Sequence, residues 1–143
     1  MKVFLIVRDL YTWPAAMLDV LFTWAEAEPL VIDMVSTSPA CLRWLTHDCP
    51  APVLRAERNA GHVGPWALGL VDEYAGPDYY AVTDSDLGLD DVPPDALLVM
   101  RDTLAREPDL CKVGLSLAID DLPADNPDRA AILAVEGRYW PPL

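Results

Sequence analysis

Two carboxylates, Asp84 and Asp86, directly follow an apolar run at residues 79–83. An Asp-x-Asp motif at the end of a strand can hold a hard divalent cation through one carboxylate and bound waters, while a diphosphate fills the remaining positions. Such a cation stabilises the negative charge on a departing nucleoside diphosphate, which sugar transfer requires. The motif therefore predicts a metal-assisted diphosphate site. The alternative that it leaves open is a solvated turn whose carboxylates cap a helix.

Two other readings of the same motif lead to different chemistry. An EF-hand loop beginning at Asp84 needs glycine at its sixth position and glutamate at its twelfth, where the chain has Leu89 and Asp95, so this class is excluded. A phosphatase with an aspartyl nucleophile also places Asp-x-Asp after an apolar strand. Its supporting residues would be Lys112 and the pair Asp120-Asp121, and this reading stays open as a lesser alternative.

The elements that must position these carboxylates alternate along the chain. Apolar, β-branched runs predict strands, and prolines at helix starts with apolar residues at helical spacing predict helices. The expected strands are 2–7, 30–35, 53–56, 79–83 and 111–119, and the expected helices are 14–28, 39–45, 65–75, 94–106 and 128–136. This order predicts one α/β domain over residues 1–143, with a mostly parallel sheet flanked by helices.

Ligands of such sheets gather outside the carboxyl ends of the strands. Several polar or glycine residues lie in or follow the other predicted strands: Asp33 lies within the second, and Arg8, Asp9, Asn59 and Gly61 follow the first and the third. We therefore expect them to lie at the same edge of the sheet as Asp84 and Asp86.

Composition limits the classes of partner. The chain has 143 residues, with 10 Lys+Arg against 23 Asp+Glu and a net charge of −13, so its surface repels polyanions and nucleic-acid binding is not expected. Its apolar runs are too short for a transmembrane segment, and the first strand meets Arg8 too early for a signal peptide. A cytoplasmic protein is expected.

Several segments together resemble bacterial glycosyltransferases of the GT-A fold, which are related to the large family of inverting transferases that use nucleotide-diphospho-sugars. In chain order the matching segments are Val31-Ile32-Asp33 with Ser36-Thr37, Arg58-Asn59 with Gly61-His62 and Pro65-Trp66, residues 79–86, Lys112-Val113-Gly114-Leu115 with residues 119–123, and Glu136 with Tyr139-Trp140. The resemblance covers nearly the whole chain.

The resemblance implies a hexosyltransferase-type donor site for a UDP- or GDP-sugar with Mn²⁺ or Mg²⁺. Asp86 is implied as the direct metal ligand and Asp84 as its partner nearer the ribose and sugar, with Asp33 contacting the base or ribose. The remaining implied donor-binding residues are Val7, Arg8, Asp9, Asn59, Gly61 and Ser85. Met34 departs from the family, where asparagine commonly follows the acidic residue.

Family members usually continue well beyond the Tyr139-Trp140 position, in a section that carries the acceptor site and the general base. We therefore expect the chain to correspond to the donor-binding half, and no catalytic base is assigned. The alternative function is a truncated, non-catalytic module that binds a nucleotide-sugar or a partner protein. A homodimer or a second chain that covers the Tyr139 and Trp140 edge is a further expectation.

Overall fold

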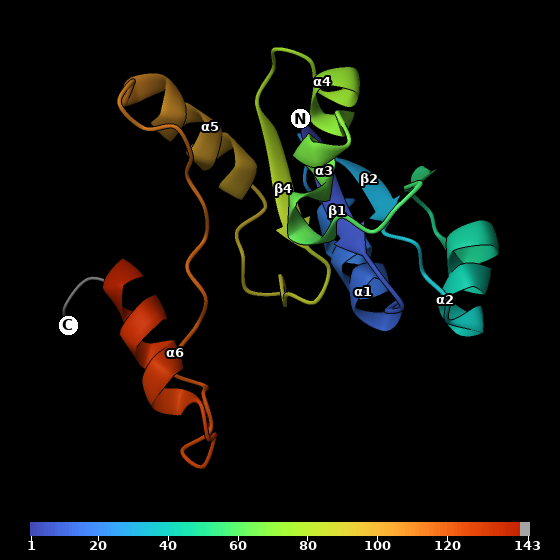
Figure 1. Ribbon diagram of the computed structural model, residues 1–143. Helices are drawn as coiled ribbons and strands as arrows, with labels where there is room; N and C mark the ends of the chain where they lie inside the picture. Colours follow the sequence, from blue (N-terminus) through green and yellow to red (C-terminus); the bar gives the residue numbers. More distant parts are fainter. Residues whose placement is uncertain (141–143) are drawn as a thin grey trace. The chain divides into compact units, whose positions relative to one another are not determined.

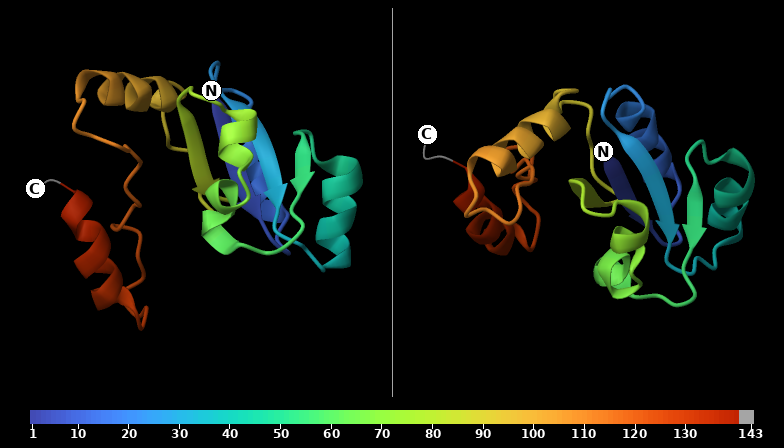
Figure 2. Two further views of the ribbon diagram at one scale, coloured as in Figure 1. Left: turned by 45° about the horizontal axis from the view of Figure 1, so that its top comes forward. Right: turned by 90° about the horizontal axis from the view of Figure 1, so that it is seen from above.

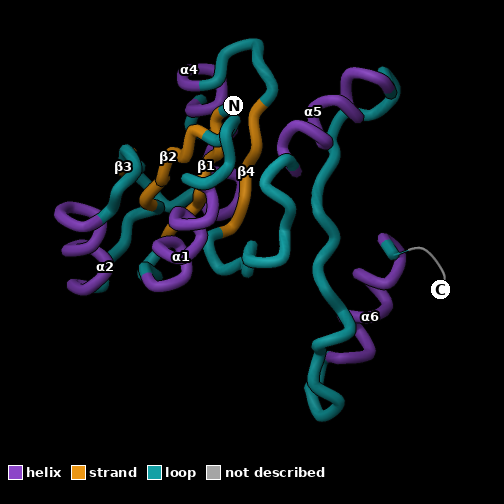
Figure 3. Tube along the Cα trace, turned by 180° about the vertical axis from the view of Figure 1, so that it is seen from behind, coloured by secondary structure: helices purple, strands orange, loops and turns teal. Residues whose placement is uncertain are grey.

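The computed structural model describes residues 1–140 and divides into an N-terminal unit, Met1–Asp102, and a C-terminal unit, Thr103–Leu143. The N-terminal unit contains a four-stranded sheet in the order β3-β2-β1-β4, in which every pair of neighbours is parallel (Figures 1 and 3). The strands are β1 (Lys2–Val7), β2 (Glu28–Asp33), β3 (Val53–Arg55) and β4 (Tyr80–Asp84). The prediction of an α/β fold with a parallel sheet is confirmed.

Helices cover both faces of this sheet (Figure 2). One face packs against α1 (Thr12–Leu21), α2 (Pro39–Arg43) and the start of α5 (Ala96–Arg106), and the other packs against α4 (Leu70–Tyr74), which follows α3 (Gly64–Ala67). The C-terminal unit contains α6 (Arg129–Glu136). Within residues 1–140, none of the helices combines the length and the apolar character needed to cross a bilayer.

The core follows from the alternation of side chains along β1. Val3, Leu5 and Val7 pack with α1 and α2, whereas Phe4 packs on the opposite face with the cluster that includes Val71 of α4. All five side chains are at most 7% exposed. A strand covered on both faces must be apolar at every position, which explains the uninterrupted run in this segment.

The second strand begins and ends two residues earlier than expected. Glu28 N donates to Met1 O at 2.9 Å on the β1 side, and Val31 N donates to Pro52 O at 3.0 Å on the β3 side. Backbone groups alternate between the two sides along a strand, so the nitrogen of Pro29 faces the β3 side. The pairing with β3 begins only at Val31, so no strand lies opposite Pro29. The missing N–H of Pro29 therefore costs no ladder bond. The strand cannot continue through Val35, which has a left-handed backbone with φ of 62°.

Three further boundaries differ from the sequence predictions. Helix α1 ends at Leu21 instead of continuing to residue 28, and the single helix expected over 65–75 is divided at Gly69, whose φ is 70°. The fifth strand expected at 111–119 is absent from the structure, which assigns these residues to no strand. An apolar run forms a strand only when a neighbouring strand completes its hydrogen-bond ladder, and the sequence alone does not identify that neighbour.

Truncation of Leu5 is predicted to destabilise the fold strongly. Its side chain is fully buried in the central strand, and Leu→Ala in such a site costs about 2–5 kcal/mol of unfolding free energy. Leu115→Ala is the matched control, because Leu115 is 52% exposed and should lose less than about 1 kcal/mol. Urea unfolding monitored by circular dichroism measures both, and equal losses would contradict this account of the core.

Candidate functional site at the carboxyl edge of the sheet

The four strands end at Val7, Asp33, Arg55 and Asp84, and we call this side of the sheet the carboxyl edge. Val7, Asp33 and Arg55 are paired in one row across the sheet, and Asp84 is paired with Ile6, one residue before the end of β1. The structure therefore brings the polar ends of β2, β3 and β4 to one edge, as the sequence predicts.

Asp9 joins the loop after β1 to the loop after β2. Its Oδ1 accepts hydrogen bonds from the backbone N–H of Ser38 at 2.6 Å and of Thr37 at 2.5 Å, and its own N–H donates to Ser36 Oγ at 2.9 Å. Ser38 is the residue that precedes α2, so Asp9 caps this helix from a distance in the chain. The Ser38 and Thr37 amides favour the ionised carboxylate, which lowers the pKa of Asp9.

Asp33 is a buried carboxylate with partners on both oxygens. Its side chain is 1% exposed; Oδ1 accepts from Ser36 N at 2.8 Å, and Oδ2 accepts from Arg55 Nε at 3.2 Å. Cys41 lies beside the same network, with its Sγ 3.5 Å from Ser36 Oγ. A buried carboxylate is stable only with such partners, so these contacts explain how a charge is tolerated at the end of β2.

Asp84 and Asp86 differ from Asp9 and Asp33. Both are exposed, and neither carboxylate has a hydrogen bond or ion pair with the residues that the structure describes. Ser85 between them is 6% exposed. The reading in which these two carboxylates cap a helix receives no support from the described contacts, since neither accepts a backbone N–H.

Asp33 and Asp84 project to opposite faces of the sheet. Paired residues of parallel strands point to the same face, and Asp33 pairs with Val7, which belongs to the core under α1 and α2. Asp84 pairs with Ile6, which packs with the core under α4. The residues implied for the base and for the metal therefore share an edge of the sheet but not a face.

The loop after β3 has a structure of its own. Asn59 Oδ1 accepts a hydrogen bond from Gly61 N at 2.9 Å, and Gly61 has a φ of 60°, which favours glycine. Both residues are exposed, as is Arg8. The amide of Asn59 therefore shapes this loop, and its contact with a nucleotide remains a prediction.

Met34 has a packing role at the position where the family commonly has asparagine. Its side chain is 1% exposed, and a Cβ on Gly64 would collide with its thioether end. Because α3 approaches Met34 this closely, position 64 has room only for glycine. At position 34, a polar side chain would be buried in an apolar cluster, which explains the methionine.

The donor set at Asp84 and Asp86 fits Mn²⁺ or Mg²⁺ in one specific way. Carboxylate oxygens suit these hard cations, which prefer six oxygen ligands. Within residues 1–140, no cluster of three or more His, Cys, Asp or Glu side chains could hold a metal ion. By donor chemistry, Asp84 and Asp86 are compatible with such a cation, whose other ligands would come from a diphosphate and water.

Sequence reasoning missed the role of residues 36–38. This Ser-Thr-Ser run supplies the partners of both Asp9 and Asp33, through Ser36 Oγ and three backbone amides. The signal was present, because hydroxyl residues between a strand and a proline-started helix are typical of capping segments.

Tyr139 and Trp140 lie in the C-terminal unit and are 65% and 42% exposed. Trp140 Nε1 donates to Leu117 O at 2.9 Å, and Arg138 lies 6.0 Å from the centre of the Tyr139 ring. Cover of this edge by a second chain remains a prediction.

No match was found when the chain was compared with protein-family models, with curated proteins and with solved structures.

Asp9→Asn is predicted to flatten the acid dependence of stability. The pKa of folded Asp9 lies below its ordinary value of 3.8, so its ionised form stabilises the protein above that pH, and the contribution is lost as the pH falls through the lowered pKa. Asparagine keeps an acceptor oxygen and tolerates the φ of 55° at this position. Thermal unfolding at neutral pH should give a lower Tm for the variant than for wild type.

The two Tm values should converge below pH 3.8. Asp78→Asn is the control, since Asp78 is exposed and its side chain has no partner among the described residues; this variant should follow wild type at every pH. Parallel curves for wild type and Asp9→Asn would show that the Asp9 charge does not hold the two loops together.

Proposed function

We propose that this chain binds a nucleotide-diphospho-sugar together with Mn²⁺ or Mg²⁺ at Asp84 and Asp86, and that it serves as the donor-binding domain of a GT-A-type glycosyltransferase. The observation that carries the proposal is the pair of exposed, unpartnered carboxylates on either side of buried Ser85 at the end of β4. Carboxylates that stabilise no part of the fold are free to take a ligand.

The cation supplies positive charge that the chain itself largely lacks. Of the few basic residues, Arg8 and Arg58 are the ones that follow β1 and β3, and both are exposed. A bound cation would neutralise the diphosphate and stabilise the charge on the leaving group. Asp84 and Asp86 would hold and orient that cation, on either side of buried Ser85.

The network of Asp9, Asp33 and Ser36 supports the proposal indirectly. It fixes the loops after β1 and β2 by hydrogen bonds within the protein. A rigid edge lowers the ordering cost of ligand binding. The side chain of Asp33 is 1% exposed, so it can contact a base or ribose only if the loops around it rearrange to expose it.

Calorimetric titration with UDP, GDP, CDP and dTDP tests the proposal. At least one diphosphate should bind with Mn²⁺ present and lose affinity with excess chelator. Equal binding under both conditions would contradict the metal-bridged site. Where binding is metal-dependent, acceptor-dependent release of the diphosphate from a sugar donor distinguishes an enzyme from the non-catalytic module. Hydrolysis of a simple phosphomonoester would instead indicate the phosphatase.

Asp86→Asn is predicted to weaken Mn²⁺-dependent diphosphate binding by at least about tenfold. Removal of a residue that only supports a metal ligand already costs about tenfold in affinity, and loss of the ligand itself should cost at least as much. Asp84→Asn should weaken it less, because the resemblance implies Asp86 as the direct ligand. Neither variant should lower the Tm, since neither carboxylate has a partner in the described structure, and relief of repulsion between like charges favours a small increase.

Asp91→Asn is the matched control, because Asp91 is an exposed carboxylate in the same loop; its titration should equal that of wild type. Unfolding of both site variants under conditions where wild type and Asp91→Asn stay folded would show that Asp84 and Asp86 have a structural role instead.

A further inference from the structure

Arg55, the last residue of β3, links a buried carboxylate to the solvent. Its Nε donates to Asp33 Oδ2 at 3.2 Å, and the side chain of Asp33 is 1% exposed whereas that of Arg55 is 59% exposed. The next residue is attached to the same partner, because Ala56 N donates to Asp33 O at 2.9 Å. The guanidinium group is therefore held at one nitrogen by the interior of the protein, while most of the side chain faces water at the carboxyl edge.

The two Nη groups of Arg55 are not used by the fold. Neither donates a hydrogen bond to any residue in the described part of the chain. An arginine that only neutralises a carboxylate commonly pairs with it through two parallel N–H groups, one to each oxygen. Here the backbone N–H of Ser36 donates to Asp33 Oδ1 at 2.8 Å, and Arg55 contacts the other oxygen through Nε alone. The planar pair of Nη groups thus remains available to a ligand.

Charge is distributed unevenly along the carboxyl edge. Residues 53–71, which contain β3 and the loop after it, have Arg55 and Arg58 against a single acidic residue, Glu57. Residues 72–95, which contain β4, have eight acidic residues and no Lys or Arg. Strands β3 and β4 lie at opposite ends of the strand order. An anion without a cation of its own is therefore repelled least at the β3 end of the edge.

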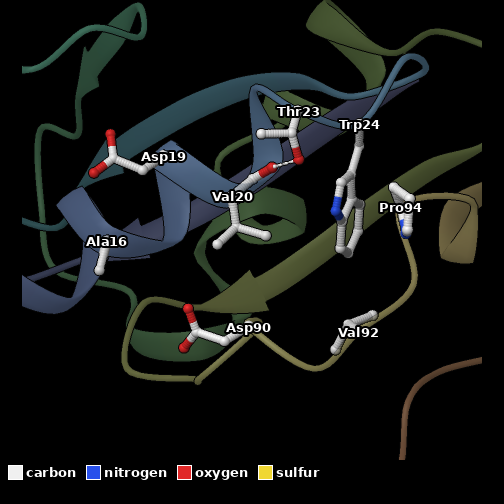
Figure 4. A pocket seen from close by; sticks show the side chains of 8 residues that line it. All are labelled: Ala16, Asp19, Val20, Thr23, Trp24, Asp90, Val92 and Pro94. Carbon is white, nitrogen blue, oxygen red and sulfur yellow. Dashed lines mark hydrogen bonds between the residues drawn. The ribbon is translucent and has the colours of Figure 1, made fainter.

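A hollow on the flank of α1 lacks these features. It has a volume of about 500 Å³, and the described residues that line it include Asp19 and Asp90 but no Lys or Arg. Figure 4 shows that the Asp19 carboxylate points away from Asp90 and from Trp24, so the polar groups of this hollow do not converge on one point. The anchored guanidinium of Arg55 is the stronger basis for a ligand site.

We propose that Arg55 binds an oxyanion, the phosphate or carboxylate group of a small ligand, through its two Nη groups, and that Asp33 is the residue that positions the guanidinium. The planar fork of an arginine matches two oxygens of such a group. A side chain already held at Nε has less conformational freedom to lose on binding. Asp33 would thus act through Arg55. The site needs no divalent cation and stands independently of the donor site at Asp84 and Asp86.

Titration with sodium phosphate and, separately, with sodium acetate tests the proposal, in excess chelator and at an ionic strength held constant with sodium chloride. The backbone ¹H–¹⁵N signals of residues 55–58 report binding at the end of β3. At least one of the two anions should shift them in a saturable way, and the anion that does so identifies the ligand group as phosphate or carboxylate. The chelator separates this result from the metal-bridged donor site, whose diphosphate binding requires the cation.

Arg55→Lys keeps a positive charge beside Asp33 but removes the fork, so it should weaken anion binding by about fivefold, the effect of losing one hydrogen bond. Arg55→Gln should abolish the saturable response. Because this second variant leaves the buried carboxylate without its cation, thermal unfolding is measured for both, and Arg55→Lys keeps the test valid if Arg55→Gln does not fold.

Arg43→Gln is the matched control, since Arg43 is an exposed arginine at the end of α2 with no partner among the described residues; its loss should leave anion binding unchanged. No saturable shift with either anion would overturn the proposal. Equal weakening by Arg43→Gln and Arg55→Gln would show attraction by general charge instead of a site, and unchanged affinity in Arg55→Lys would overturn recognition by the fork.

Discussion

The hydrogen bonds from the backbone of Thr37 and Ser38 to the Asp9 carboxylate hold the carboxyl edge of this sheet together. They join the loop after the central strand β1 to the loop after β2, across 28 and 29 residues of sequence. The same short segment satisfies buried Asp33 through Ser36. One chain of contacts therefore fixes three elements: the exit of β1, the exit of β2 and the start of α2. The left-handed backbones of Asp9 and Val35 are tolerated because these contacts determine both loops.

The network divides the acidic residues of the edge into two kinds. Asp9 and Asp33 have their oxygens occupied by amides, a hydroxyl and a guanidinium, so they are part of the fold. Asp84 and Asp86 have no such partners among the described residues. Sequence position alone does not separate the two kinds, since all four follow or end apolar strands. The division depends on which strand is central and which lies at the edge of the sheet, because β4 has only β1 beside it.

The sequence was sufficient to predict the parallel α/β class and the position of β1, β3 and β4 to within a residue or two, because apolar, β-branched runs bounded by turn residues favour strands. It was insufficient at Val35, where the run continues after the strand has ended, and at residues 111–119, where the run has no ladder. The strand ends predicted correctly that Asp33 and Asp84 lie at one edge of the sheet, while ligand binding there stays a prediction. The opposite orientation of Asp33 and Asp84 needed the register of the strand pairs, because shifting a strand by one residue reverses its faces.

The charge balance of the chain limits how an anionic ligand can reach the proposed donor site. With 23 acidic and 10 basic residues, the chain has an excess of carboxylates, and those that the fold does not use are exposed to solvent. An anionic ligand can approach the acidic end of β4 only with its own cation, which is the arrangement proposed at Asp84 and Asp86. Binding of a diphosphate there would therefore depend on the divalent cation, because the two exposed carboxylates alone repel the anion.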